Sequence, residues 1–439
     1  MANRVLFWMK HSRELAATIR SIRITANHLE KVEYVFLFGL FLSCATDYLI
    51  PSPRTSVSPA EIFSCLFILW RWTVGGMENA QLGRGIRRLI WAFRLFAIYA
   101  GILWLFSNDW FNRRGMLVDW VLAALLVDCL LRSRWSDWKP VAALFILAAL
   151  PNAVWSALQH AMGLGLAPKG LFGWGGGATS SPIMGFFGYS NNLATYLYWP
   201  LLVCAGMVAA SRTWRRIPYL ALTLLYGLVL YWTISRSTLL TVGFVVVVLL
   251  FLFLFHHRKQ FLIAAAIGTV LAALAVSWIF LTQPLAWINS ILSDRLNLWN
   301  AGLQIIFSNK YLLPFGYLTI PPTGLSIVWV PHNIYILSWI EFGVPGFLLL
   351  IGLGGFFLYS GWRRYDKLRT RFPTAVLWGG LAGLFLINGM AILYFQETYI
   401  IINFLCVTAI WAAQLREIDS PVAPGNSGVP HAENGLPSG

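Results

Sequence analysis

The stretch "TLLTVGFVVVVLLFLFLF" (Thr238–Phe255) is an apolar run without a single charged side chain. A transmembrane helix needs roughly 20 mostly apolar residues, and this run is close to that length. The rest of the chain has the same character, because 58% of its 439 residues are hydrophobic and only 11% are charged. A soluble domain cannot bury so large an apolar fraction, so the sequence predicts a polytopic membrane protein.

The expected fold is all-α, because backbone groups in hydrocarbon must pair within their own segment, and the apolar runs lack the alternation of a β-barrel. We expect a cytoplasmic or interfacial N-terminal segment (1–32), a transmembrane domain (33–414) and a disordered cytoplasmic tail rich in Pro, Gly and Ser (415–439). About twelve spans are expected, at residues 33–51, 60–77, 88–107, 115–131, 140–161, 192–210, 217–234, 238–255, 261–281, 334–359, 374–394 and 397–414.

The net charge of +15 is typical of nucleic-acid-binding proteins, but its distribution favours another explanation. Most of the 32 Lys and Arg residues fall in the segments that alternate spans place on one side. Because basic segments stay in the cytoplasm, this bias predicts that both termini are cytoplasmic and that nucleic acid is not a partner. All five cysteines lie in predicted spans without a C-x-x-C pair, which disfavours a disulfide framework or a zinc site.

Two long segments, 162–191 and 282–333, fall on the outer side, where loops of such length are usually functional. Helix-like spacing of apolar residues predicts a surface helix near 287–308 in the second segment. That segment ends at His332, in "PHNIYILSWIEFGVPG" (Pro331–Gly346). His332 is a candidate general base, because its pKa lies nearest to working pH. The alternative is purely structural, with His332 and Asn333 beginning a helix that Asn333 caps.

Arg236 lies between two strongly apolar spans, in the short turn Ser235–Ser237. A guanidinium flanked by two hydroxyls suits a phosphate group, although an arginine at the headgroup level could also simply snorkel. Arg295 is a further outer cation, which Asp294 could neutralise. One base and two arginines on one face indicate a lipid-linked anionic substrate, because fixed arginines stabilise a diphosphate leaving group without a metal. The outer acids are scattered, so we expect no divalent metal.

The motif at His332 reads H-N, nine residues, G-V-P-G, which resembles the His-Asn-x9-Gly-x-x-Gly signature of the bacterial O-antigen ligases. The stretch "GFFGYSNNLATYL" (Gly185–Leu197) resembles the Gly-x-Phe-x-x-x-Asn-x-Leu-Ala pattern of the wider O-antigen ligase and polymerase superfamily. "SRST" at a span junction and "DRLNLWNAG" in the second outer segment also fit that superfamily. The resemblance covers roughly residues 185–350.

This resemblance implies a GT-C-type glycosyltransferase with about twelve transmembrane helices and a large periplasmic loop between the ninth and tenth. Such an enzyme transfers a polysaccharide from undecaprenyl diphosphate to a sugar hydroxyl of the lipid A–core oligosaccharide. The reaction takes place at the periplasmic face of the inner membrane, is inverting, and needs neither metal nor cofactor. The implied partners are these two glycolipids and membrane lipids.

The resemblance also implies roles for single residues. His332 would deprotonate the acceptor hydroxyl, Arg236 and Arg295 would bind the donor diphosphate with Ser235 and Ser237, and Asn333 would orient His332 or the acceptor. Asn191 is the expected match to the family asparagine, with Asn192 as the alternative, and Glu397 is a further substrate contact. Gly343 and Gly346 would let their helix bend or pack closely, and Glu341 would be paired inside the bundle.

Three other functions remain open on sequence grounds. An O-antigen polymerase and an oligosaccharyltransferase acting on protein hydroxyls would use the same donor with a different acceptor. A transporter of the lipid-linked glycan would show gating charges or broken helices near the bilayer midplane.

Overall fold

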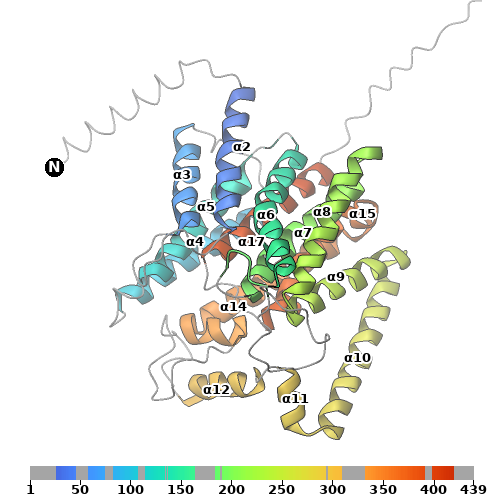
Figure 1. Ribbon diagram of the computed structural model, residues 1–439. Helices are drawn as coiled ribbons and strands as arrows, with labels where there is room; N and C mark the ends of the chain where they lie inside the picture. The colour runs from blue at the N-terminus through green and yellow to red at the C-terminus, as the bar shows by residue number, and fades with distance from the viewer. Residues whose placement is uncertain are drawn as a thin grey trace, which may run out of the picture.

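The computed structural model describes residues 26–45, 58–74, 83–106, 114–133, 135, 137–163, 183–187, 190–292, 295–308, 332–390 and 398–419. All regular structure in these residues is helical (Figure 1). The helices are α2 (Ala26–Ser43), α3 (Pro59–Thr73), α4 (Arg84–Leu105), α5 (Arg114–Arg132), α6 (Trp138–Ala161), α7 (Ser190–Ala210), η1 (Thr213–Arg215), α8 (Arg216–Trp232), α9 (Arg236–Leu254), α10 (Arg258–Thr282), α11 (Leu285–Ile291), α12 (Arg295–Ser308), α14 (Ile334–Arg363), α15 (Tyr365–Thr370), α16 (Phe372–Leu386), η2 (Asn388–Met390) and α17 (Thr398–Asp419).

Each of the twelve predicted spans overlaps one of these helices. Within the described residues, 8 helices are long and apolar enough to cross a membrane, and α8 is a shorter apolar helix. The all-α polytopic membrane fold expected from the sequence is therefore confirmed, whereas the number of twelve spans stays a prediction.

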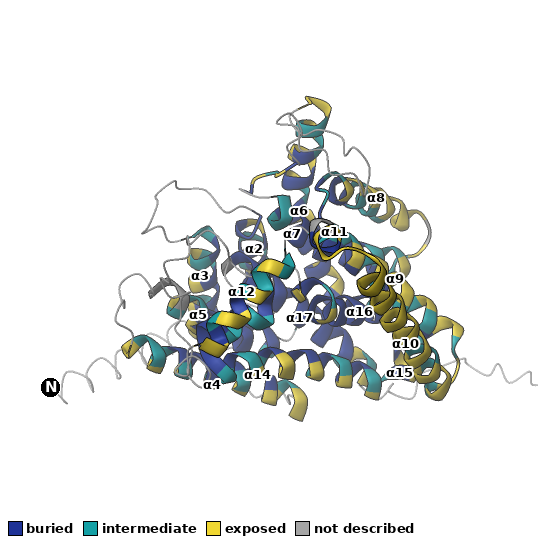
Figure 2. Cartoon of the chain, turned by 90° about the horizontal axis from the view of Figure 1, so that it is seen from below, coloured by how far each residue is buried: buried dark blue, intermediate teal, exposed yellow. Residues whose placement is uncertain are grey.

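The centre of the bundle is formed by α7, α16 and α17, whose side chains are buried on nearly every face. At the edge stands α10, which has no buried residue and exposes apolar side chains along its length (Figure 2). An apolar helix that is exposed on all sides is stable in lipid and not in water. The exposure of α10 therefore agrees with a membrane environment.

Two helices lie beyond the bundle, at the far end of α10, and Figure 1 shows them below it. The single surface helix predicted at 287–308 is instead two helices, α11 and α12, separated before Arg295. The side chain of Asn289 in α11 accepts a hydrogen bond from the backbone N–H of Leu296 at 3.2 Å, which ties the two helices together. The break makes Arg295 the first residue of a helix.

A sharp reversal divides α14 at Gly343, whose φ of 64° and ψ of −156° lie outside helical space. This combination is essentially restricted to glycine. In a continuous helix Ile334 and Leu350 would lie about 24 Å apart, yet both line one small cavity. The rings of Trp339 and Phe347 also pack with centroids 4.7 Å apart. The part before Gly343 therefore folds back along the part after it, so the predicted bend is confirmed.

Gly346 makes this close packing possible, because a Cβ there would collide with Ser338 and Phe342 of the first part.

The end of the chain also differs from the expectation. Helix α17 continues through Asp419, so residues 415–419 are helical and are not part of the expected tail. The rest of the tail and residues 1–25 lie outside the described residues.

Candidate active site

The turn between α8 and α9 carries the first predicted site residues. The Thr233 hydroxyl donates to the Leu230 carbonyl at 2.6 Å and closes α8, and Ser235 is the N-cap of α9. Between them, Ile234 has a φ of 57°, a left-handed conformation that is rare for a β-branched residue. Such strain costs about 1–3 kcal/mol and is kept where the surrounding structure requires that geometry. The strained turn makes Arg236 the first residue of α9.

The two serines beside Arg236 differ in their contacts. Ser235 Oγ lies 3.1 Å from Thr238 Oγ1 in a hydrogen bond within the first turn of α9. Ser237 is buried, and its Oγ has no hydrogen-bond partner. A buried hydroxyl without a partner costs free energy, so Ser237 is the better candidate of the two to bind a ligand.

His332 and Asn333 immediately precede α14. The Asn333 side chain accepts hydrogen bonds from the backbone N–H groups of Tyr335 at 2.9 Å and Ile336 at 3.2 Å. Asn333 therefore caps the helix, which is the structural role that the sequence left open for it. His332 has a φ of 42°. Among the described residues, it and Ile234 are the only non-glycine residues with a positive φ, and both adjoin predicted site residues.

The structure brings Arg295 within electrostatic range of both Arg236 and His332, although the three residues belong to different parts of the chain. Burial, and then the positive charge of Arg236, lowers the pKa of Arg295. Burial, and then the charge of Arg295, lowers the pKa of His332 below its ordinary value. Arginine stays protonated in proteins despite such a shift. His332 is therefore held as a neutral imidazole beside a fixed positive charge, which is the protonation state that a general base requires.

Three helices begin at this cluster, because Arg236 and Arg295 are the first residues of α9 and α12, and His332 precedes α14. A helix N-terminus carries unpaired N–H groups and about half a positive charge. Helix α12 packs against α14, and the rings of Phe307 and Trp339 lie 6.5 Å apart. This contact lies near the end of α12 and in the part of α14 before Gly343. Helix N-termini and arginines both favour anions, so the arrangement suits an anion such as a phosphate.

A fourth segment, η2, completes this end of the bundle. It contacts both α9 and α14, and a Cβ at Gly389 would collide with Ile334. The Asn333 side chain also donates to Met390 Sδ at 3.8 Å. Asn388 is fully buried in η2, although sequence reasoning did not select it. The signal was present, because an amide in a predicted span is costly and often functional.

Two predicted substrate contacts are not joined to the cluster by the described interactions. Asn191 is half-buried in the first turn of α7. Among the residues that the structure describes, it forms no hydrogen bond with Arg236, Arg295 or His332. Glu397 and Asp294 lie outside the described residues. The roles proposed for Asn191 and Glu397 therefore stay predictions.

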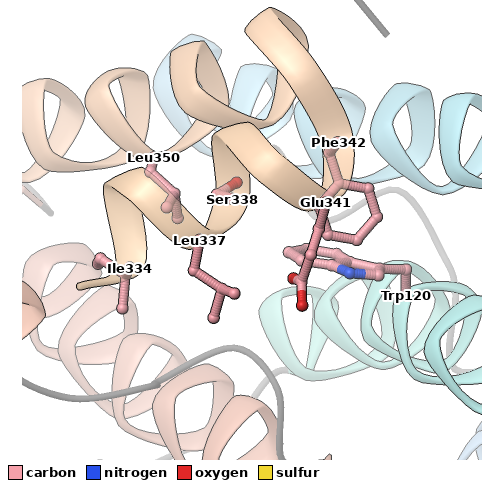
Figure 3. Close-up of a pocket in the computed structure, with 7 residues that line it drawn as sticks. All are labelled: Trp120, Ile334, Leu337, Ser338, Glu341, Phe342 and Leu350. Atoms are coloured by element: carbon pink, nitrogen blue, oxygen red, sulfur yellow. The ribbon is translucent and has the colours of Figure 1, made fainter. Parts of the chain in front are cut away.

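Glu341 is buried in the part of α14 before Gly343. It lines a cavity of about 10 Å³ together with Trp120 and Leu337. Figure 3 shows its carboxylate beside the Trp120 ring, on the same side of the helix as Leu337. A single water molecule needs about 10–15 Å³, so this cavity holds at most one and is no sugar site.

Arg71 and Arg94 lie within predicted spans, and the structure pairs each of them with an acid. Arg71 Nη1 lies 3.0 Å from Glu33, and Arg94 Nη2 lies 2.8 Å from Asp128. Both arginines are therefore structural.

Within the described residues no group of three or more His, Cys, Asp and Glu side chains is arranged to hold a metal ion. Metal independence itself remains a prediction.

Comparison with known families adds one finding. Residues 221–351 match the family described as O-Antigen ligase. This range begins in α8 and ends in α14, and it contains Arg236, Arg295 and His332. The match confirms the superfamily named from the sequence, and it supports a glycosyltransferase activity of the ligase or polymerase type. No curated protein matches the chain.

Proposed function

We propose that this chain, whose residues 221–351 place it in the O-antigen ligase and polymerase superfamily, is an O-antigen ligase. It transfers a polysaccharide from undecaprenyl diphosphate to a sugar hydroxyl of lipid A–core, at the periplasmic face of the bacterial inner membrane. The proposed fold is of the GT-C type, with twelve spans and both termini in the cytoplasm. The observation that carries this proposal is the coupling of His332, Arg295 and Arg236 at three helix N-termini.

In the proposed reaction, His332 accepts the proton of the acceptor hydroxyl while that oxygen attacks the anomeric carbon of the donor sugar. The bond from this carbon to the diphosphate oxygen breaks, and the diphosphate leaves with both bonding electrons. Attack from the opposite side inverts the anomeric centre. Arg236, Arg295 and the helix N-termini stabilise the charge that develops on the leaving group. Positive groups that are already fixed in place act without reorganising during the reaction.

Several features support this assignment of roles. Neutral His332 can accept a proton, whereas a histidine paired with a carboxylate would more readily be protonated. Ser237 offers a buried hydroxyl without a partner beside Arg236. The nearby strained residues Ile234 and His332 indicate geometry that is maintained against a cost in stability.

The first test is transfer by the purified protein, with undecaprenyl-diphosphate glycan as the donor and lipid A–core as the acceptor. His332→Ala is compared with the wild type and with His256→Ala, because His256 is exposed in the connection between α9 and α10. We expect a product of high molecular mass from the wild type and the control, and none from His332→Ala. Full activity of His332→Ala would contradict the role of His332 as the base.

The same assay separates the alternatives by their products. Longer glycans on the lipid carrier would indicate a polymerase, and glycan attached to a supplied protein acceptor would indicate an oligosaccharyltransferase. Broken helices such as α14 also occur in transporters. The donor is therefore also enclosed in vesicles, so that its movement across the bilayer can be measured. Movement of the donor across the bilayer without any transfer would contradict a glycosyltransferase.

A further inference from the structure

A second polar site lies at the end of the bundle opposite His332. It is a pocket of about 260 Å³ between the starts of α6 and α16 and the ends of α7 and α17. Sites for small molecules typically span about 300–1,000 Å³, so this volume suits a small polar group. Because α7 begins and α16 ends at the His332 end, the length of these helices separates the two sites.

Part of the pocket lining is polar. Lys139, Arg371, Thr374 and Gln414 line it, together with Glu417. Gln414 is only 3% exposed, and its Oε1 has no hydrogen-bond partner. A turn of the amide by 180° exchanges its oxygen and nitrogen, so Gln414 can instead offer its N–H groups to an anion in the pocket.

The charges of the pocket favour a singly charged anion. Glu417 lies 3.6 Å from Arg371 and accepts a hydrogen bond from Trp138 Nε1 at 3.0 Å. Lys139 is exposed and forms no ion pair among the described residues. Lys139 and Arg371 against Glu417 leave one net positive charge in the wall. Two helices begin and two end at the pocket, so their dipoles offset each other and the charge preference comes from the side chains.

The pocket is also lined by the apolar residues Trp138, Phe372, Pro373, Ala209 and Ala210. Aromatic side chains at the ends of apolar helices mark the headgroup level of a membrane. Basic pockets between transmembrane helices at this level bind phospholipid headgroups. We propose that this pocket binds the phosphodiester of a glycerophospholipid, with Lys139, Arg371 and the amide N–H groups of Gln414 as its ligands and the apolar lining residues against the acyl chains.

The experiment is native mass spectrometry of the full-length protein after delipidation in detergent. Phosphatidylglycerol and phosphatidylethanolamine are offered separately, and diacylglycerol, which lacks phosphate, is the negative control. We expect both phospholipids to be retained and diacylglycerol to be lost. Equal retention of all three would overturn the proposal. Thermal protection by inorganic phosphate with no lipid retained would assign the pocket to a free anion and overturn a lipid site.

Variants place the binding in this pocket. Lys139→Ala removes an exposed cation without breaking a pair, and we expect about fivefold weaker retention. Lys259→Ala is the matched control, because Lys259 is exposed at the start of α10, away from the pocket. Equal retention by these two variants would overturn the site.

Gln414→Leu gives a second readout that a merely structural role would not produce. Replacing a buried amide without a partner by an apolar side chain of similar size maintains or raises the melting temperature of the delipidated protein. We expect this outcome together with weaker lipid retention. Unchanged lipid retention in Gln414→Leu would remove Gln414 from the ligand set and contradict the proposal.

Discussion

At the end of the bundle where α6 begins, arginines lie against carboxylates. Arg71 pairs with Glu33, and Asp128 bridges Arg94 and Arg132 at 2.8 and 2.7 Å. At the His332 end, burial and then a neighbouring arginine lower the pKa of Arg295 and of His332. Ion pairing stabilises a fold, whereas two like charges held within electrostatic range of each other favour an anionic ligand. The difference separates structural arginines from those proposed to act on a substrate.

The comparison is tested most strongly by the proposed base. A general base contributes typically 10²–10⁴-fold to a rate, so His332→Ala is expected to lower kcat by at least about 100-fold. Assembly of the bundle should be unaffected, because His332 is only half-buried and precedes its helix. Single-turnover kinetics and the melting temperature measure the two effects separately. A loss of folding in parallel with activity would assign His332 to structure and remove the contrast between the two ends.

The sequence was most informative where polar residues interrupt apolar runs. Arg236 and His332 were recognisable because a charge or an imidazole at the mouth of a span is costly without a purpose. Local pattern also predicted the bend at Gly343 and the cap at Asn333. The full reversal of α14, and the meeting of Arg236, Arg295 and η2, depend on packing between segments far apart in sequence. Periodicity carries no information on such contacts, whereas Asn388 could have been selected as an amide within a predicted span.

At the paired end, the expected effect is on stability. Arg71→Met leaves the Glu33 carboxylate buried with the indole of Trp135 as its remaining partner among the described residues, at 3.2 Å. Breaking a buried ion pair costs about 3–5 kcal/mol. We expect a clear fall in melting temperature without a change in the pH dependence of transfer.

The control for this prediction is Arg258→Met. Its partner is Asp366, and both side chains are exposed, at 40% and 66%. Exposed pairs contribute about 0–1 kcal/mol, so the melting temperature should hardly change. Equal destabilisation by the two variants would show that burial does not distinguish these pairs.

A smaller effect is expected from Arg236→Lys. An ammonium keeps the charge but cannot present the planar fork that binds two phosphate oxygens. Hydrogen bonds to charged groups contribute about 1.5–3 kcal/mol, so losing one corresponds to a rate decrease of about tenfold or more. Steady-state kinetics with varied donor measures it. An unchanged kcat/KM would make Arg236 a residue that only anchors the helix end at the membrane surface.

Arg295→Gln tests, through the pH dependence of transfer, whether the charge of Arg295 acts on His332. Burial and the Arg295 charge hold the pKa of His332 below its ordinary value, so the neutral base form persists as the pH falls. Without that charge the pKa of His332 rises, and activity is then lost at a higher pH. The acid limb of kcat/KM, which reports the free enzyme, should therefore move to higher pH. A limb that stays in place would show that Arg295 does not act on His332.

The smallest effect is expected from chelation. If the fixed cations alone stabilise the leaving group, EDTA should leave the transfer rate unchanged. The assay is repeated with Mg²⁺ restored to the treated enzyme. Complete loss in EDTA and recovery with Mg²⁺ would refute the metal-free mechanism.

The fold-back of α14 also has a consequence for how the protein responds to its bilayer. Residues 344–363 alone extend about 30 Å at about 1.5 Å per residue, which is the thickness of a hydrocarbon core. Residues 334–342 are therefore not needed for the crossing, although a hydropathy profile counts both parts as one span. A thicker or thinner membrane tilts or strains the crossing part. Because the helix reverses at Gly343, we expect such a change to act directly on the crossing part and to reach the segment that follows His332 only through the packing of side chains between the two parts.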